Sequence, residues 1–496
     1  MKLKTNYGMV VSGHREATKS GIKILKNGGN AMDAAIAASA TLAVAIPNMS
    51  GLGGDSIALW YDAKKNKISV INGSGRSPSK ATKKYFISKG LKKIPQRGPL
   101  SISVPGLVHS WEISSKKYGK KKLKILLKDS IVLAKKGIKV DKYLKSFLES
   151  KIYRSLIKKN KYLSNIYGDR KKVKINSTIK QIELSETIRE ISKKGAKAFY
   201  NGKISRVLLR EIKKQGSILN EDDFKKHKTL IQKPISTDYS KRKIFTAPPN
   251  SQGLALIYLC KYFKNHKKIK KKIDVFNYLK NKKKAFKARD LYCVDPHIYK
   301  TENKFKKILN QNYYQQKING DTSTLVAVDK MGNAVCWVQS LFEEFGSGIV
   351  SPSTGIVLHN RLYLEKITGN YKNQLKPNKR PFHTLCPSMV MNNNNLDLVI
   401  ATPGDHGQPQ TIFQIINFIY TQKYNIQKAI NLPRIRHNNG NKILVEKGFE
   451  KNFTNFKKVK LNIYKNKDRL FGGVTAIKIN KDKTLSKGAD KRRFCY

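Results

Sequence analysis

The sequence is poor in cysteine and in long apolar runs. Five cysteines stand among 496 residues, an odd count without any CxxC spacing. This pattern argues against a disulfide framework or a zinc site, and it favours cysteines that serve as small buried apolar residues. We therefore expect no metal ion and no cofactor. No stretch approaches the run of about 18 uncharged apolar residues that a transmembrane helix requires, so no membrane span is predicted.

Acidic residues are also scarce. They number 33 against 100 lysines and arginines, which gives a formal net charge of +67. A field of this size attracts nucleic acid and anionic membranes without specificity. However, the lysines are spread along most of the chain, and no RRM, KH, zinc-finger or helix-turn-helix signature is present. We interpret the charge as compositional drift of the surface and expect no specific nucleic-acid partner.

The N-terminus, MKLKTNYGMVVSGHREAT, contains no apolar stretch of signal-peptide length. This predicts a cytoplasmic protein, or a periplasmic one if translation begins upstream of the printed start. At roughly 150 residues per domain the length would suggest about three domains, although large α/β enzymes of this length also form one unit. The hydrophobic fraction of 39% is sufficient for a sizeable core.

Helix and hairpin signals are clear in several segments. The string SGIKILKNGGNAMDAAIAASATLAVAI predicts one helix up to the Gly-Gly-Asn break and a second, alanine-rich helix from about Ala31 to Pro47. Hairpins are predicted in SIALWYDAKKNKISVING, in TSTLVAVDKMGNAVCWVQS and in MVMNNNNLDLVIATPG. An apolar helix is expected over 411–419. The lysine-rich run over 261–272 reads as a solvated helix face.

The hairpin that begins at Thr322 carries a possible nucleophile. A threonine hydroxyl reacts poorly by itself, but a threonine at a chain N-terminus can use its own α-amine as the base. Position 2 offers no such residue, so the chain would have to be cut, and the Asp321–Thr322 junction at the mouth of a strand is a suitable place. On its own this signal is weak, because a threonine that opens a strand is ordinarily a β-former.

A second feature is the glycine-bearing turn over 403–407, which precedes the predicted helix. Free backbone N–H groups at the positive end of a helix can stabilise an oxyanion. The turn is therefore a candidate oxyanion hole.

The order of several long motifs resembles the γ-glutamyltranspeptidase family over nearly the whole chain. The resemblance is carried by GMVVSGHREATKSGIKILKNGGNAMDAAIAASATLAV, IPNMSGLGGDSIALWYDAK, RGPLSISVPGLVHSWE, APPNSQG, GDTSTLVAVDKMGNAV, FGSGIVSPSTGIVLHNR, HTLCPSMVM and TPGDHGQPQT. The region over about 120–240 matches more loosely.

The resemblance implies an α/β (α+β) fold, the four-layer αββα sandwich of N-terminal-nucleophile (Ntn) hydrolases. It implies a precursor cut into a large subunit, 1–321, and a small subunit, 322–496, which together form one αββα domain. The implied activity is that of a γ-glutamyltransferase or glutathione hydrolase, with a small glutathione-like amide as substrate and the two subunits as each other's partners.

The resemblance also assigns site residues. Thr322 corresponds to the nucleophile, and Ser340 to a hydroxyl beside it. Gly404 matches the first glycine of the family's oxyanion-hole pair, and Asp405 replaces the second; the backbone N–H survives this change. His383 and Thr384 fall where the family often has two serines near the substrate.

The positions that hold the glutamyl group depart from the family. The usual arginine is replaced by Ser74. Arg76 stands two residues on, on the same face of an extended strand but about 6–7 Å away. The acidic residue that grips the α-amine aligns with Leu364, and its asparagine partner with Phe342. Glu365, next to Leu364, would point elsewhere in an extended chain.

These departures leave two other functions open. The sequence also resembles the transpeptidase-like branch of the family, which includes cephalosporin and glutaryl acylases, so an acylase without glutamyl preference is one alternative. An inactive, basic binding protein is the other. Four further residues in family-like stretches are interpreted as structural, in a buried ion pair or a helix cap: His14, Arg289, Asp290 and Arg434.

Overall fold

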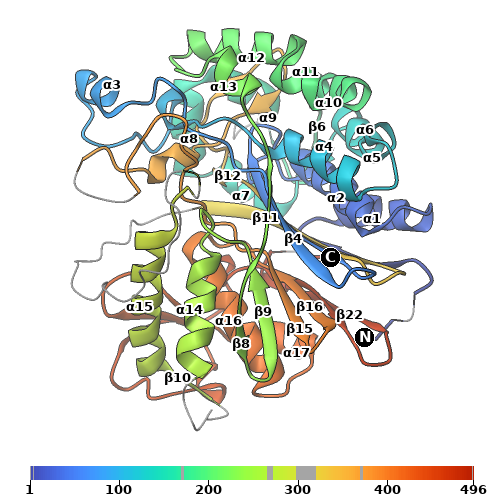
Figure 1. Cartoon of the computed structure of the whole chain (residues 1–496). Coiled ribbons are helices and arrows are strands. Elements are labelled where there is room, and N and C mark those ends of the chain that lie inside the picture. The colour runs from blue at the N-terminus through green and yellow to red at the C-terminus, as the bar shows by residue number, and fades with distance from the viewer. Residues whose placement is uncertain are drawn as a thin grey trace.

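Two large sheets lie face to face in a computed structural model (Figure 1). It describes residues 2–3, 5–168, 173–264, 272–295, 297, 320–368, 373–493 and 495–496. The first sheet has the strand order β2 (Gly8–Ser12), β11 (Gly320–Asp329), β12 (Ala334–Glu343), β3 (Asp55–Asp62), β4 (Lys67–Asn72) and β7 (Leu230–Gln232). The second has the order β1 (Lys2–Leu3), β22 (Leu485–Ala489), β21 (Thr475–Ile479), β16 (Asn395–Ala401), β15 (Ser388–Asn392), β9 (Arg242–Thr246) and β8 (Ile235–Tyr239).

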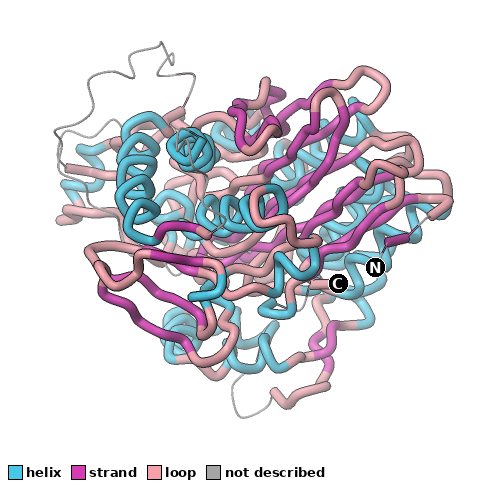
Figure 2. The backbone as a smooth tube through the Cα atoms, turned by 90° about the horizontal axis from the view of Figure 1, so that it is seen from below, coloured by secondary structure: helices cyan, strands magenta, loops and turns pink. Residues whose placement is uncertain are grey.

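Helices cover the outer face of each sheet, as both views show (Figures 1 and 2). The first sheet is covered by α1 (Arg15–Lys26), α2 (Ala31–Ala45) and α4 (Leu107–Tyr118). The second is covered by α14 (Gly253–Lys264), α16 (Gln408–Tyr420) and α17 (Ile426–Asn431), with α15 (Val275–Tyr292) packed on α14. The layers therefore run α, β, β, α, and the predicted sandwich is confirmed.

Shorter elements surround these layers. The further helices are α3 (Lys83–Ser88), α5 (Leu123–Leu126), α6 (Lys128–Lys136), α7 (Lys142–Leu148), α8 (Lys151–Lys159), α9 (Lys161–Tyr167), α10 (Ile182–Lys194), α11 (Ala196–Tyr200), α12 (Lys203–Lys214) and α13 (Glu221–Lys225). The further strands are β5 (Ile138–Lys139), β6 (Thr178–Ile179), β10 (Ile273–Asp274), β13 (Val350–Ser351), β14 (Ile356–Val357), β17 (Ile435–His437), β18 (Lys442–Glu446), β19 (Phe453–Thr454) and β20 (Lys460–Tyr464). The 3-10 turns are η1 (Pro99–Ser101), η2 (Arg361–Leu364), η3 (Asp405–Gly407), η4 (Phe449–Lys451), η5 (Arg469–Phe471) and η6 (Lys491–Arg493).

Strand β11 lies between β2 and β12 in the first sheet and is buried on both faces. Leu325 and Ala327 belong to the core under helices α1, α2 and α4. Val326 and Val328 belong to the core between the two sheets. Because side chains alternate along a strand, the even-numbered positions of β11 face the second sheet. The hydroxyl of Thr324 accordingly meets that of Thr475 on β21, 3.0 Å away.

Helix α2 is buried along its whole length. Asn30 and Asp33 form a capping box at its N-terminus, and the carboxylate of Asp33 also accepts hydrogen bonds from the backbone of Lys120 and Lys121. The many alanines allow it to lie close to α1, α6 and the first sheet. The two predicted helices and the break between them are confirmed.

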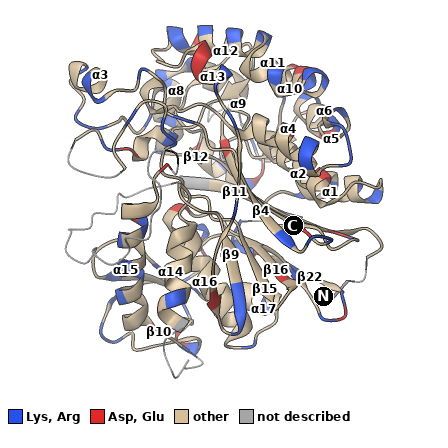
Figure 3. Ribbon diagram, in the orientation of Figure 1, with Lys and Arg blue, Asp and Glu red and all other residues tan. Residues whose placement is uncertain are grey.

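The predicted hairpins are confirmed as β3–β4, β11–β12 and β15–β16, and the apolar helix as α16. The lysine-rich run over 261–272 lies mostly outside the described residues. Cysteines 260, 293, 336 and 386 are buried, as expected, whereas Cys495 is partly exposed. No described helix is long and apolar enough to cross a membrane. Lysine and arginine occur on helices on either side of the two large sheets (Figure 3).

The packing of α2 gives a stability prediction. Ala38 is fully buried, so Ala38→Leu would overpack the contact between α2 and its neighbours and lower the free energy of unfolding by about 1–3 kcal/mol. The matched control is Ala63→Leu, in the partly exposed turn between β3 and β4. Chemical denaturation of both variants tests this, and equal stabilities would contradict the close packing.

Candidate active site

Thr322 lies at an irregularity between β11 and β12. Asp321 pairs with Phe342, but Ser323 pairs with Gln339, so Ser340 and Leu341 both stand opposite Thr322. This is a β-bulge in β12, a feature that redirects side chains and is frequent beside active sites. The junction predicted from the sequence therefore lies in a strand whose regular pairing is interrupted at Thr322.

The hydroxyls of Thr322 and Ser340 meet at this bulge. Their oxygens are 3.5 Å apart, and Thr322 is 3% exposed. The Ser340 hydroxyl also accepts a hydrogen bond from the backbone N–H of Phe342, at 2.7 Å. Phe342 has a φ of 75°, a left-handed conformation that is rare for a bulky residue. The bulge thus holds the Ser340 hydroxyl beside that of Thr322.

The turn over 402–407 approaches Thr322 from the second sheet. It continues from β16, and its 3-10 turn η3 packs against β11. Gly404 and Asp405 have φ values of 118° and 45°. Neither N–H donates a hydrogen bond to any described residue. Backbone N–H groups that lack a hydrogen-bond acceptor in such a turn can bind an anion.

The Asp405 side chain points to Arg436, with 2.7 Å between Oδ1 and Nη2. Burial raises the pKa of Asp405, while the Arg436 guanidinium opposes that rise. The carboxylate that replaces the family's second glycine is therefore engaged in a buried ion pair.

A buried carboxylate organises the other side of the site. Asp55, at the start of β3 and opposite Ser340 on β12, accepts hydrogen bonds from the amides of Gly75 and Gly106. Its Oδ2 lies 3.3 Å from Nδ1 of His359 and 3.2 Å from Nε2 of His383. Burial alone would raise the pKa of Asp55, but attraction to and hydrogen bonds with the two histidines outweigh it, so the pKa lies well below its usual value.

His383 and Thr384 occupy the segment that leads into β15. Burial and the nearby Arg361 cation lower the pKa of His383 to about 3, so its imidazole is neutral. Gln252 donates to the carbonyl oxygens of Thr384 and Asp405, the latter at 2.6 Å. The APPNSQG motif therefore ties the segment with Thr384 to the turn with Gly404.

The structure shows the contacts of the residues that depart from the family at the glutamyl-binding positions. The Ser74 hydroxyl donates to Asn72 at 2.6 Å and is fully buried. Arg76 is partly exposed, and its Nε has no hydrogen-bond partner among the described residues. Leu364 lies in an apolar cluster with Phe342. Glu365 forms a buried ion pair with Lys379, so it turns away from the position of the missing acid.

One residue of the site has no counterpart in the sequence prediction. Arg361, at the start of η2, is fully buried. Its Nη1 donates to the Thr384 hydroxyl at 3.2 Å, and its guanidinium lies over the Phe342 ring, 4.2 Å from the centroid. Nε and Nη2 have no hydrogen-bond partner among the described residues. The signal in the sequence was its place at the end of the family-like motif FGSGIVSPSTGIVLHNR, three residues before Leu364.

A cavity of about 50 Å³ is lined by Thr322 and by residues at the C-terminus. His14, Asn48, Arg493 and Tyr496 contribute to its lining. Among the described residues, no group of histidine, cysteine or acidic side chains is arranged to hold a metal ion.

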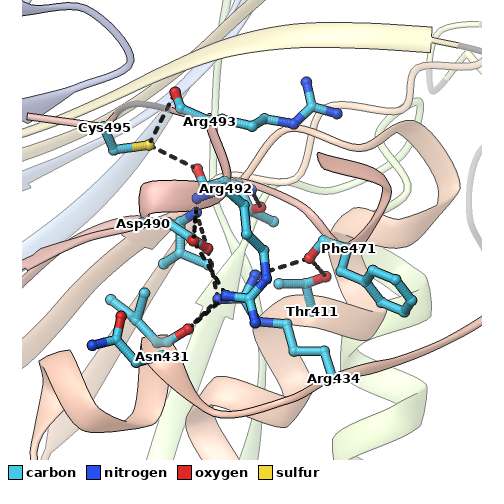
Figure 4. Close-up of polar contacts among 12 residues, drawn as sticks. Thr411, Asn431, Arg434, Phe471, Asp490, Arg492, Arg493 and Cys495 are labelled. Carbon is cyan, nitrogen blue, oxygen red and sulfur yellow. Dashed lines mark hydrogen bonds and ion pairs between the residues drawn. The ribbon is translucent and has the colours of Figure 1, made fainter. Parts of the chain in front are cut away.

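The four residues interpreted as structural have structural contacts. His14 caps α1 through a hydrogen bond from the N–H of Glu16. Arg289 pairs with Asp290 at 2.6 Å. Arg434 forms a buried ion pair with Asp490 at 2.6 Å, and it donates to the carbonyl of Phe471 at 2.8 Å (Figure 4).

The chain is similar to several known proteins. A family model described as Gamma-glutamyltranspeptidase matches residues 17–494. The chain is 33% identical to a glutathione hydrolase-like YwrD proenzyme of Bacillus subtilis, over 98% of this chain and 97% of that protein. It is 27% identical to a glutathione hydrolase proenzyme of the same organism, over 90% and 83%. The crystal structure of a cephalosporin acylase from Bacillus halodurans superposes with a TM-score of 0.90 and 26% identity, over 100% of this chain and 96% of that one.

The buried histidines predict acid sensitivity. Burial lowers the pKa of His383 and His437 to about 3, and those of His227 and His406 well below the usual value. Below pH ~6.5 the unfolded chain takes up protons that the folded chain does not, so each histidine removes about 1.4 kcal/mol of stability per pH unit until its folded pKa is reached. The loss from Asp55 has the same sign and begins near pH ~3.9.

Thermal midpoints measured from pH ~7 to ~4 test this window. His437→Gln should flatten the slope, because it removes one of these buried titrating groups. Midpoints that do not change across the window would contradict the neutral state of these histidines.

Proposed function

The chain belongs to the gamma-glutamyltranspeptidase family, and we propose that it cuts itself between Asp321 and Thr322 and then hydrolyses amides through an acyl-Thr322 intermediate. The observation that carries the proposal is the bulge that brings the hydroxyls of Thr322 and Ser340 together. The proenzyme relatives named above support a precursor.

Self-cleavage begins with attack of the Thr322 hydroxyl oxygen on the carbonyl carbon of Asp321. The peptide C–N bond breaks, an ester forms between Asp321 and the Thr322 oxygen, and the proton passes to the released α-amine. Water then hydrolyses the ester, which gives Asp321 a carboxylate and Thr322 a free hydroxyl. Ser340 is placed to hydrogen-bond the attacking oxygen.

The two products would stay in one domain. The large subunit, 1–321, contributes β2, β3, β4 and β7 to the first sheet, and the small subunit, 322–496, contributes β12 and most of β11. The second sheet is shared in the same way. Separating the subunits would expose both sheet cores, so they are each other's obligate partners.

In the mature enzyme the α-amine of Thr322 takes the proton from its own hydroxyl as that hydroxyl attacks the substrate amide. The N–H groups of Gly404 and Asp405 hold the oxyanion, because neither donates a hydrogen bond to another described residue and η3 packs on β11. Since Arg436 engages the Asp405 carboxylate, only the Asp405 backbone serves the reaction. Water or an acceptor amine then takes the acyl group.

Arg76, His383 and Thr384 are assigned to the acyl side of the site. Thr384 offers a hydroxyl, Arg76 a cation, and neutral His383 is held by Asp55. A γ-glutamyl amide such as glutathione is the substrate that the named relatives support. The acylase alternative is supported by the similarity to the cephalosporin acylase and by the apolar side chains of Leu364 and Phe342.

The nucleophile is tested by Thr322→Ala. We expect an uncut, inactive chain of 56.3 kDa, whereas the wild type gives fragments of 321 and 175 residues (496 minus 321). Intact mass and N-terminal sequencing measure this, and the new terminus should read Thr-Ser-Thr-Leu. The matched control is Thr324→Ala, two residues along the same strand, which should still be cut. A cut and active Thr322→Ala protein would refute the proposal.

The oxyanion hole is tested by Gly404→Ala. A φ of 118° is strained for any residue with a Cβ, so the turn must shift and move both donors. We expect kcat to fall by about 10²–10³, the cost of losing one such donor. Gly440→Ala is the control, since Gly440 also has a positive φ, 68°, but lies in open space. Equal activities of the two variants would argue against the assignment.

A further inference from the structure

Arg361 is a buried cation whose Nε and Nη2 donate to no residue that the structure describes. It forms no ion pair with a described acidic residue, and two of its three guanidinium nitrogens have no hydrogen-bond partner there. A charge in this position is costly unless something compensates it. The long-range attraction of Asp55 and Glu343 supplies part of the compensation.

Both of those carboxylates are occupied by other groups. Asp55 is held by two histidines and two backbone amides. Glu343 is paired with Arg97 at 3.2 Å and accepts hydrogen bonds from Gln96 and Asn360. Arg361 therefore has donors to spare for an anion that is not part of the described chain.

The guanidinium is connected with Thr322 by a chain of direct contacts. It stacks on Phe342, whose N–H binds the Ser340 hydroxyl, and that hydroxyl meets Thr322. On its other side it binds the hydroxyl of Thr384. An acyl group bound at Thr322 that extends along this chain of contacts meets Arg361 at its far end.

We propose that Arg361 binds a carboxylate at the far end of the acyl group, so that the preferred substrates are monoamides of dicarboxylic acids without an α-ammonium group. The proposal rests on the proposed function of Thr322. An α-ammonium would have to lie beside a guanidinium and the apolar side chains of Leu364 and Phe342, where no described carboxylate is free to receive it.

The experiment compares kcat/KM for glutaryl-p-nitroanilide, its neutral carbamoyl isostere 4-carbamoylbutyryl-p-nitroanilide, and γ-glutamyl-p-nitroanilide. We expect the wild type to prefer the glutaryl substrate over both others by about 10- to 100-fold, the range for a hydrogen bond to a charged group. Arg361→Gln should abolish the preference over the isostere, and Arg361→Lys should restore part of it.

Two further variants make the test specific. Arg206→Gln removes one positive charge from the exposed surface of α12 and should leave the preference unchanged. Arg76→Gln tests whether Arg76 binds the carboxylate instead. If it removes the preference while Arg361→Gln keeps it, the carboxylate site is at Arg76 and the inference is overturned.

Mass analysis of every protein separates the possible failures. A wild type that stays uncut, or hydrolyses none of the three amides, refutes the proposed function. A cut, active wild type without preference for the glutaryl substrate refutes the role of Arg361 alone. If Arg361→Gln does not mature, the wild-type comparison and Arg361→Lys still decide the question.

Discussion

The carboxylate of Asp55 is the contact on which the substrate side of the site depends. It gathers the amides of Gly75 and Gly106 and the imidazoles of His359 and His383 at one buried point. These partners come from segments far apart in the sequence, and the histidines lie on the far side of the proposed cut. Since each partner belongs to a loop that borders the site, one buried charge holds loops of both prospective subunits in register with β3.

Much of the fold follows from local patterns. The strands of the two sheets are short apolar runs closed by Gly, Asn or Lys turns, so β3–β4, β11–β12 and β15–β16 could be predicted as hairpins. The pairing of strands that lie far apart in the sequence could not be predicted from such patterns. For example, β12 lies beside β3 and β15 beside β9, and nothing in a strand's own composition specifies a partner so far away.

The candidate site likewise contains residues that the sequence could predict and residues that it could not. Thr322 and Gly404 lie in long family-like motifs and Ser340 lies five residues beyond one, so the resemblance could assign them roles before their surroundings were known. Arg361 was missed because its environment is three-dimensional: it depends on the turn η2, on the left-handed φ of Phe342 and on the segment with Thr384. The partner of Asp405 was equally invisible, since Arg436 lies in a separate sheet.

The substitutions at the acyl side make physical sense as a set. An asparagine and an acid suit a substrate ammonium, and replacing them with Phe342 and Leu364 removes both its acceptors. The same change gives Arg361 an aromatic face to lie on, which stabilises a desolvated guanidinium by about 2 kcal/mol or more. Burial of an unpaired guanidinium costs several kcal/mol, so stacking alone does not offset it. A buried arginine at that cost, in contact with Phe342 and Thr384 and with two nitrogens that donate to no described residue, is best explained by an anionic group that arrives with the substrate.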